Sequence, residues 1–281
     1  MACPFLDEGR AVYCHAAPMR KLILEGPGVT MGGLCTSREY KQCGLAAKDS
    51  VQMDRCPHLE EVHVQYCGAA PITKLVPFSD SQLSSCGSGS YRYCDAYLAQ
   101  AQPHGATRPE NLLYTANHFW LDVDETGLCH IGVDEFLAEV ADHVDGIAFA
   151  TLQGTHCPGL TVTIHGVEWP MFFPNAMVIQ KVNNRVRTDP AKLTTDPYGV
   201  GWLFEGQELK GITRAGLLSG AEATTWQNGE RERLSQQIHD LHAPMCDGGL
   251  PARGVAHLLS KPDLTCLCKD FFGNSGWLVE E

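Results

Sequence analysis

The 281-residue sequence lacks several features that would assign it to a common class of protein. It has no cluster of Lys and Arg, and its net charge of −12 opposes binding to nucleic acid or to anionic lipid. Its apolar runs are too short to cross a bilayer. The N-terminus MACPFLDEGR is acidic where a signal peptide would be basic and then apolar. We therefore expect a cytoplasmic protein that binds no nucleic acid and is not inserted in a membrane.

Familiar catalytic motifs are also missing. The sequence contains no Ser-His-Asp order, phosphate-binding loop, GxGxxG turn or HExxH helix, so no catalytic residue is predicted. A hydrophobic content of 44% and a charged content of 19% exclude a disordered chain. An accessory or electron-transfer protein is favoured over an enzyme.

Cysteine, by contrast, is abundant, with 13 residues in a chain that carries no export signal. In a reducing compartment such cysteines more often bind metal or do redox chemistry than form disulfides. Eight of them belong to a duplicated segment that begins CPFLDEGRAVYCHAAP in the first copy and CPHLEEVHVQYCGAAP in the second. The eight candidate metal ligands are Cys3, Cys14, Cys35, Cys43, Cys56, Cys67, Cys86 and Cys94.

Four cysteines in each copy could complete a tetrahedral zinc site or hold one iron–sulfur cluster. The close C-x₂₋₄-C pairs of zinc ribbons are absent from both copies, and Cys3 and Cys56 are each followed by Pro. We therefore expect two iron–sulfur clusters, of the [4Fe–4S] type, one per copy and side by side as in an electron relay. Two Zn²⁺ ions are the alternative, and a repeat without metal is the third.

The composition changes after the repeats and predicts five segments. These are a first four-cysteine module (1–50), a second (51–98), a linker (99–111), a β-rich domain (112–240) and a cysteine-containing extension (241–281). Within the β-rich domain, the runs HFWLDVD, CHIGV, GIAFATL, LTVTIHGV and AMVIQKV predict strands. DEFLAEVADHV predicts a short helix capped by Asp134.

Three stretches of the β-rich domain resemble the glycine-cleavage H protein family. They are LLYTANHFWLDVDETGLCHIGVDEFLAEVADHVDGIAFATL, then LTTDPYGVGWLFEGQ with Pro197, Tyr198, Gly201 and Trp202, and finally GLLSGAEATTW. The resemblance covers roughly residues 111–240. It implies a lipoyl-domain-like barrel–sandwich hybrid with peripheral helices, and with the two modules an α+β, mainly β, chain.

The sequence departs from the family where the family presents a lipoyl-lysine on a hairpin. The corresponding stretch, TVTIHGVEWPMFFPNAM, contains no lysine, and the nearest, Lys181, falls on the following strand. We therefore expect no lipoate. His165 and Glu168 near the hairpin tip could form an acid/base pair, although a solvated histidine is the commoner situation.

Two further groups are candidate sites. Trp169, Met171, Phe172 and Phe173 of the same hairpin are individually typical of core packing, but together they could form a docking patch for a protein partner. Cys246, Cys266 and Cys268 in the extension could form a third metal site, although three cysteines are a weak signal. Cys129 and Cys157 are expected to pack as small apolar residues.

Three functions are compatible with these features. The first is a non-lipoylated H-protein-like subunit that carries two iron–sulfur clusters and docks onto a larger redox complex. The second is a zinc-stabilised adaptor for protein–protein contacts. The third, a carrier of lipoyl or aminomethyl groups, is the least favoured because the lysine is missing.

Overall fold

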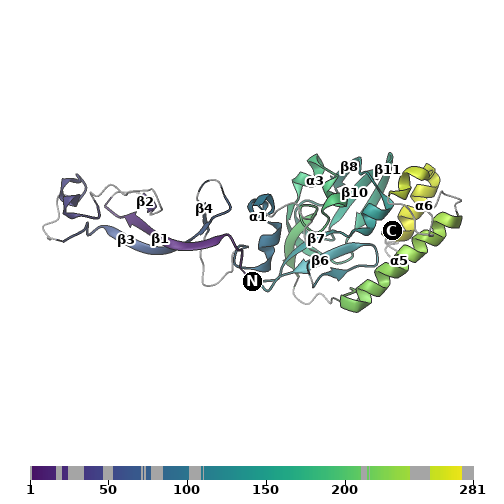
Figure 1. Cartoon of the computed structure of the whole chain (residues 1–281), viewed down its shortest axis with the longest axis horizontal. Coiled ribbons are helices and arrows are strands. Elements are labelled where there is room, and N and C mark those ends of the chain that lie inside the picture. Colours follow the sequence, from purple (N-terminus) through teal and green to yellow (C-terminus); the bar gives the residue numbers. More distant parts are fainter. Residues whose placement is uncertain are drawn as a thin grey trace. The chain divides into compact units, whose positions relative to one another are not determined.

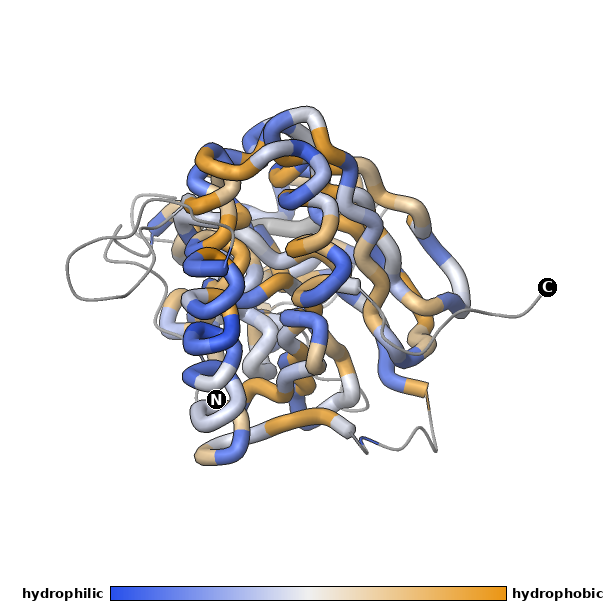
Figure 2. Tube along the Cα trace, turned by 90° about the vertical axis from the view of Figure 1, so that its right-hand side faces the viewer, coloured by the Kyte–Doolittle hydropathy of each residue, from blue (hydrophilic) through white to orange (hydrophobic). Residues whose placement is uncertain are grey.

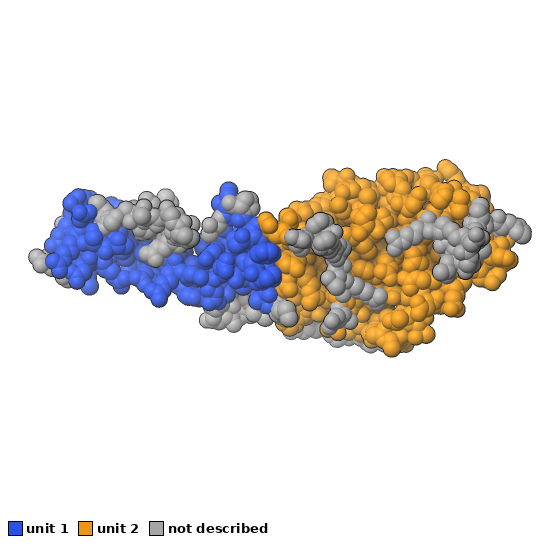
Figure 3. All heavy atoms as spheres, viewed as in Figure 1, with its two compact units in different colours: residues 1–88 blue, residues 89–281 orange. Residues whose placement is uncertain are grey.

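The computed structural model divides into two compact units, residues 1–88 and residues 89–281 (Figures 1 and 3). The structure describes residues 2–16, 21–24, 35–46, 53–70, 72, 74–76, 85–100, 109, 111–209, 214, 216–240 and 254–273. The division falls inside the second copy of the repeat, eleven residues before the linker predicted to begin at residue 99. Most of that linker lies outside the described residues.

The first unit is built on one antiparallel sheet with the strand order β2-β1-β3-β4. Its strands are β1 (Leu6–Cys14), β2 (Lys21–Leu24), β3 (Leu59–Cys67) and β4 (Lys74–Val76). The two long central strands are the same segment of the two repeats, and they pair with each other along their whole length. The two copies therefore share one sheet and are not separate modules.

The second unit contains two antiparallel sheets. The three-stranded sheet has the order β11-β10-β8, from β8 (Gly146–Phe149), β10 (Gly159–Ile164) and β11 (Val167–Phe172). The six-stranded sheet has the order β5-β6-β7-β13-β12-β9, from β5 (Leu113–Tyr114), β6 (Phe119–Val123), β7 (Leu128–Val133), β9 (Gly154–His156), β12 (Met177–Val182) and β13 (Phe204–Glu208). Within the described part of this unit, neither sheet closes into a barrel.

Helices flank these sheets. They are α1 (Asp95–Gln100), α2 (Phe136–Val140), α3 (Asn184–Thr188), α4 (Lys192–Thr195), α5 (Gly220–Asp240) and α6 (Lys261–Phe272), with short 3₁₀ helices at Gly89–Tyr93 and Val255–Leu258. The long helix α5 is mostly hydrophilic (Figure 2). Helix α6 is held against it where Arg233 and Gln237 donate hydrogen bonds to Asp270.

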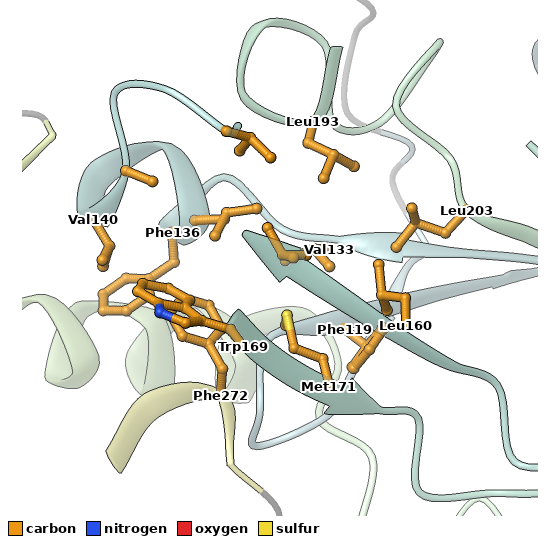
Figure 4. Packing of buried hydrophobic residues seen from close by; sticks show 14 of the residues in the cluster. Phe119, Val133, Phe136, Val140, Leu160, Trp169, Met171, Leu193, Leu203 and Phe272 are labelled. Carbon is orange, nitrogen blue, oxygen red and sulfur yellow. The ribbon is translucent and has the colours of Figure 1, made fainter. Parts of the chain in front are cut away.

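One large cluster of buried apolar residues joins both sheets to helices α2, α3, α4, α5 and α6. Trp169 of β11 is fully buried against Phe272 of α6, with 5.3 Å between the ring centroids (Figure 4). Helix α6 contributes Leu264, Leu267, Cys268, Phe271 and Phe272 to the cluster. The extension predicted to lie outside the β-rich domain thus completes its core.

The predicted strands of the second unit are confirmed, each within a few residues of its expected place. The helix predicted from Asp134 is shorter than expected. The Asp134 carboxylate accepts a hydrogen bond from the Phe136 N–H as a cap would, but Ala141 is already extended and ends the helix at Val140. None of the described helices is long and apolar enough to cross a membrane.

Candidate functional site

The cysteines of the repeat lie at the two ends of the paired strands β1 and β3. Cys14 lies opposite Leu59, and Cys67 lies opposite Leu6, which is the repeat counterpart of Leu59. The register therefore has an approximate two-fold symmetry centred on Arg10 and His63, which face each other. Each end of the sheet therefore contains the end of the central strand of one copy and the first cysteine of the other copy.

At one end, Cys56 of the second copy meets the first copy. Its backbone N–H donates to the Cys35 carbonyl (2.9 Å), and it packs in a small cluster with Tyr40 and Ala46. Cys35, Cys43 and Leu59 are partly buried against the same cluster. Three cysteines thus belong to or pack against the cluster that contains the buried Tyr40.

The other end of the sheet repeats this arrangement within the first unit. The Cys3 N–H donates to the Cys86 carbonyl (2.7 Å), which is the counterpart of the bond between Cys56 and Cys35. Cys67 ends β3 opposite Leu6, whose N–H donates to the Cys3 carbonyl (3.0 Å). Cys94, the last cysteine of the second copy, belongs to the second unit.

The prediction of one four-cysteine site inside each copy does not fit this sheet. Cys3 precedes β1 and Cys14 ends it, and a nine-residue strand spans roughly 26 Å at about 3.3 Å per residue. Thiolates that share one ion lie within about 4 Å of each other, because each Zn–S bond is about 2.3 Å. Cysteines at opposite ends of this strand are therefore too far apart to bind the same ion.

The side chains are brought near each other but are not arranged around an ion. Within the described residues, no three His, Cys, Asp or Glu side chains stand in a geometry that would hold a metal. The twelve described cysteines form no disulfide with one another. Metal binding by the repeat therefore stays a prediction. The structure shows which of the candidate ligands lie at the same end of the sheet.

In the second unit, the hairpin between β10 and β11 turns on two residues. His165 (φ 49°) and Gly166 (φ 67°) both adopt left-handed backbone conformations, as in the two-residue turns that match strand twist. The Gly166 N–H donates to the Asp145 carboxylate (3.0 Å). The His165 Nε2 lies 3.6 Å from the Asp142 carboxylate, a different acidic residue from the predicted partner Glu168.

The four hairpin residues expected to form a docking patch do not share one surface. Trp169 and Met171 are fully buried and Phe173 is almost so, because alternate residues of β11 face the core. Phe172 is 40% exposed. The expectation of core packing for single residues is thus confirmed for three of the four, and a docking role on this strand rests on Phe172.

A buried cluster of one histidine and two carboxylates, to which α5 contributes Glu230, was not predicted from the sequence. The His118 side chain is fully buried, with Nδ1 3.1 Å from the Asp134 carboxylate and Nε2 3.7 Å from Glu230. Arg233 lies 2.9 Å from the same Glu230 oxygen. Burial alone would lower the pKa of His118, but the two carboxylates outweigh it and raise that pKa.

The cysteines outside the repeat are mostly structural. Burial raises the pKa of Cys129 to about 12, and its Sγ donates to the Gly206 carbonyl (3.2 Å). Cys266 and Cys268 are two residues apart on α6 and therefore point in different directions, Cys266 exposed and Cys268 buried. These two do not form the predicted third metal site together, and Cys246 lies outside the described residues.

The helix α6 could have been predicted. Ser260 precedes it as a cap with Pro262 in its first turn, and its buried residues recur at the three- and four-residue intervals of an amphipathic helix. The cluster around His118 had no comparable signal, because its members lie far apart in the sequence.

Comparisons with known proteins agree with the resemblance of the β-rich domain. Glycine cleavage system H proteins from Beutenbergia cavernae and Salinibacter ruber are 30% and 32% identical to this chain. The matches cover 40% and 41% of the chain and 97% and 94% of those proteins. The H protein of Marinobacter nauticus is 28% identical over 38% of this chain and 88% of its own length. No family model matches the chain.

Among solved structures, a glycine cleavage system H protein from Mycobacterium marinum matches with 26% identity and a TM-score of 0.37. The match covers 43% of this chain and 98% of that one. Nearly the whole length of the relatives is thus contained in less than half of this chain, and the rest, including the cysteine repeat, is additional. On the identity and coverage of these relatives, the chain belongs to the glycine cleavage system H protein family.

Proposed function

We propose that this chain is a non-lipoylated accessory protein of the H-protein family. Its first unit binds metal through the repeated cysteines, and its second unit docks onto a larger protein complex. The observation that carries the metal-binding part is the composition of the first unit's small cluster. Three of its six residues, Cys35, Cys43 and Cys56, are cysteines.

The absence of a lipoyl group is supported by the hairpin between β10 and β11. Lipoate is attached through a primary amine, and no lysine lies between residues 159 and 172. The Lys261 amine approaches the hairpin in space, since its Nζ lies 3.3 Å from where a side chain at Gly166 would begin. Intact mass of the purified chain tests this claim. A mass without a lipoyl increment is expected, and an increment mapped to Lys181, Lys261 or any other lysine would overturn it.

A structural metal is supported by how little apolar surface the described part of the first unit buries. A unit this small rarely gains enough free energy from such a core alone, and structural zinc can supply much of what is missing. Cysteine-only ligand sets suit Zn²⁺, which is tetrahedral and does not change oxidation state. In this form the protein is an adaptor whose first unit is rigid when metal is bound.

Iron–sulfur clusters are the second candidate, supported by the Cys-Pro dipeptides at Cys3 and Cys56 and by the buried Tyr40 beside the thiols. The partner would then be a redox complex, and each cluster would exchange electrons separately because the ends of the sheet are far apart. Metal analysis and absorption spectra of anaerobically purified protein decide between these forms. Brown protein with iron and sulfide supports clusters, and colourless protein with zinc supports the adaptor. Protein with neither would overturn metal binding.

A further inference from the structure

We infer that each metal site of the first unit takes its thiol ligands from both copies of the repeat. One site contains Cys14, Cys35 and Cys43 of the first copy with Cys56 of the second. The other contains Cys67 and Cys86 of the second copy with Cys3 of the first. The inference rests on the metal binding proposed above, and it assigns ligands differently from the order of the sequence.

The strand register carries the first step. Cys14 ends β1 opposite Leu59, and the Leu59 N–H donates to the Cys56 carbonyl (3.3 Å) in a tight turn. The adjoining bond from the His15 N–H to the His58 carbonyl (2.9 Å) extends the pairing beyond the strand end. Cys14 and Cys56 therefore lie at the same end of the sheet, although they belong to different copies.

The loop that follows in the first copy carries the second step. A 3₁₀ helix at Arg38–Gln42 lies between Cys35 and Cys43, and its Ser37 cap accepts a hydrogen bond from the Glu39 N–H. The Cys43 N–H donates to the Tyr40 carbonyl (2.9 Å), and both cysteines pack against the small cluster that contains Tyr40. The bond from the Cys56 N–H to the Cys35 carbonyl then joins this loop to the second copy.

The two-fold symmetry carries the third step. The bonds from Cys3 to Cys86 and from Gly68 to Phe5 (2.8 Å) are the counterparts of those from Cys56 to Cys35 and from His15 to His58. At both ends of the sheet, the first cysteine of one copy thus donates a backbone hydrogen bond to the third cysteine of the other copy. The ligand assignment of the second site is limited to Cys3, Cys67 and Cys86, all of which belong to the first unit.

One consequence is that a single copy cannot complete its own site. The first cysteine of each copy is delivered to the opposite end of the sheet, so both copies must fold together before either ion is fully ligated. The duplication is then one metal-binding unit with two sites.

Paired substitutions distinguish this grouping from one site per copy. In C14S/C56S, both changes fall in the same proposed site, so bound metal should fall from about two equivalents per chain to about one. In C3S/C14S, each change falls in a different proposed site, so bound metal should fall to near zero. One site per copy predicts the reverse for both variants. The matched control is Cys157→Ser in the second unit, which should keep both equivalents.

A second measurement keeps the grouping testable if a variant does not fold or if the wild-type chain binds no metal. Bound metal is removed from the wild-type chain with a chelator, and the chain is then crosslinked with a short bifunctional thiol reagent. The crosslinked peptides are identified by mass spectrometry. Links between Cys35 and Cys56 and between Cys3 and Cys86 are expected. Links between Cys3 and Cys35 would overturn the grouping. A metal-free chain with the expected links would overturn the proposed function and leave the grouping intact.

Discussion

The described residues of the two units differ in how much apolar side chain they bury. In the second unit, one cluster of buried residues runs through both sheets and reaches α5 and α6. In the first unit, the described residues form a cluster of six around Tyr40. Both units are built on antiparallel sheets, so strand pairing alone does not explain the difference. It indicates that packing stabilises the second unit, and the proposed metal binding would supply stability that the small cluster of the first unit lacks.

The largest expected effect comes from Cys56→Ser. Removing this proposed ligand should release the ion that Cys56 shares with the first copy. Binding of a structural zinc ion is worth about 10–16 kcal/mol in zinc-finger peptides. Hydrogen exchange across β1 and β3 should rise strongly. Tryptophan fluorescence should be unchanged, because all five tryptophans lie in the second unit.

The control for this prediction is Cys157→Ser, a half-buried cysteine of the second unit whose Sγ lies 3.7 Å from the Pro174 carbonyl. It should leave the exchange of β1 and β3 unchanged. If β1 and β3 keep normal protection from hydrogen exchange in Cys56→Ser, the first unit does not depend on bound metal, and the proposed contrast between the units is wrong.

The next largest effect is expected from Trp169→Ala in the second unit. Trp169 is fully buried between β11 and α6, and deleting a buried aromatic ring typically costs about 3–5 kcal/mol of unfolding free energy. Urea denaturation followed by tryptophan fluorescence measures this loss. Phe172→Ala on the same strand is the matched control, because that ring is 40% exposed. Equal losses in the two variants would contradict the described core.

A smaller effect tests the boundary between the units. Tyr93, near the end of the second copy, stacks on His130 at 4.0 Å, and its hydroxyl donates to the Asp122 carboxylate (2.7 Å). Tyr93→Phe should therefore destabilise the second unit by about 1.5–3 kcal/mol, as for a hydrogen bond to a charged group. A double-mutant cycle with Asp122→Asn should show coupling between the two side chains. Additive losses would show that this part of the repeat is not anchored there.

The smallest effect concerns pH. The pKa of His118 is raised in the folded state, so its stabilising contribution is complete below about pH 6.5, the unfolded value, and is lost as pH rises through the folded value. The unfolding free energy of the second unit should fall over that range, by up to about 1.4 kcal/mol per pH unit.

His118→Asn should remove this pH dependence. Asparagine tolerates the left-handed backbone at this position, where φ is 65°, so the variant changes the charge more than the fold. Denaturation curves from pH 5.5 to 9 test this. An unchanged slope in the variant would show that another group titrates.

Much of the second unit could be predicted from its sequence, because alternation of apolar residues marks strands locally. The strands around Phe119–Val123 and Met177–Val182 were found this way. The short helix α2 was overestimated, since its apolar spacing continues to Val144 although the backbone becomes extended at Ala141. Local pattern indicates which residues are buried, but not where packing against neighbours ends a helix.

The first unit shows what a repeat cannot reveal. Duplication identified the cysteines of each copy, yet a sequence repeat contains no information on whether its strands pair within a copy or between copies. Here β1 pairs with β3, so the sheet brings cysteines of different copies to the same end, which the order of the sequence does not indicate. The same holds for Glu230, which lies far from His118 and Asp134 in the chain and meets His118 only when α5 packs on the rest of the second unit.

The measurement that tests the account most directly is hydrogen exchange of the wild-type chain before and after removal of bound metal with a chelator. If bound metal holds the first unit together and packing holds the second, strands β1 and β3 should lose most of their protection. Strands β6, β7, β10 and β12 should keep theirs. Unchanged protection of β1 and β3 after complete metal removal would contradict the account.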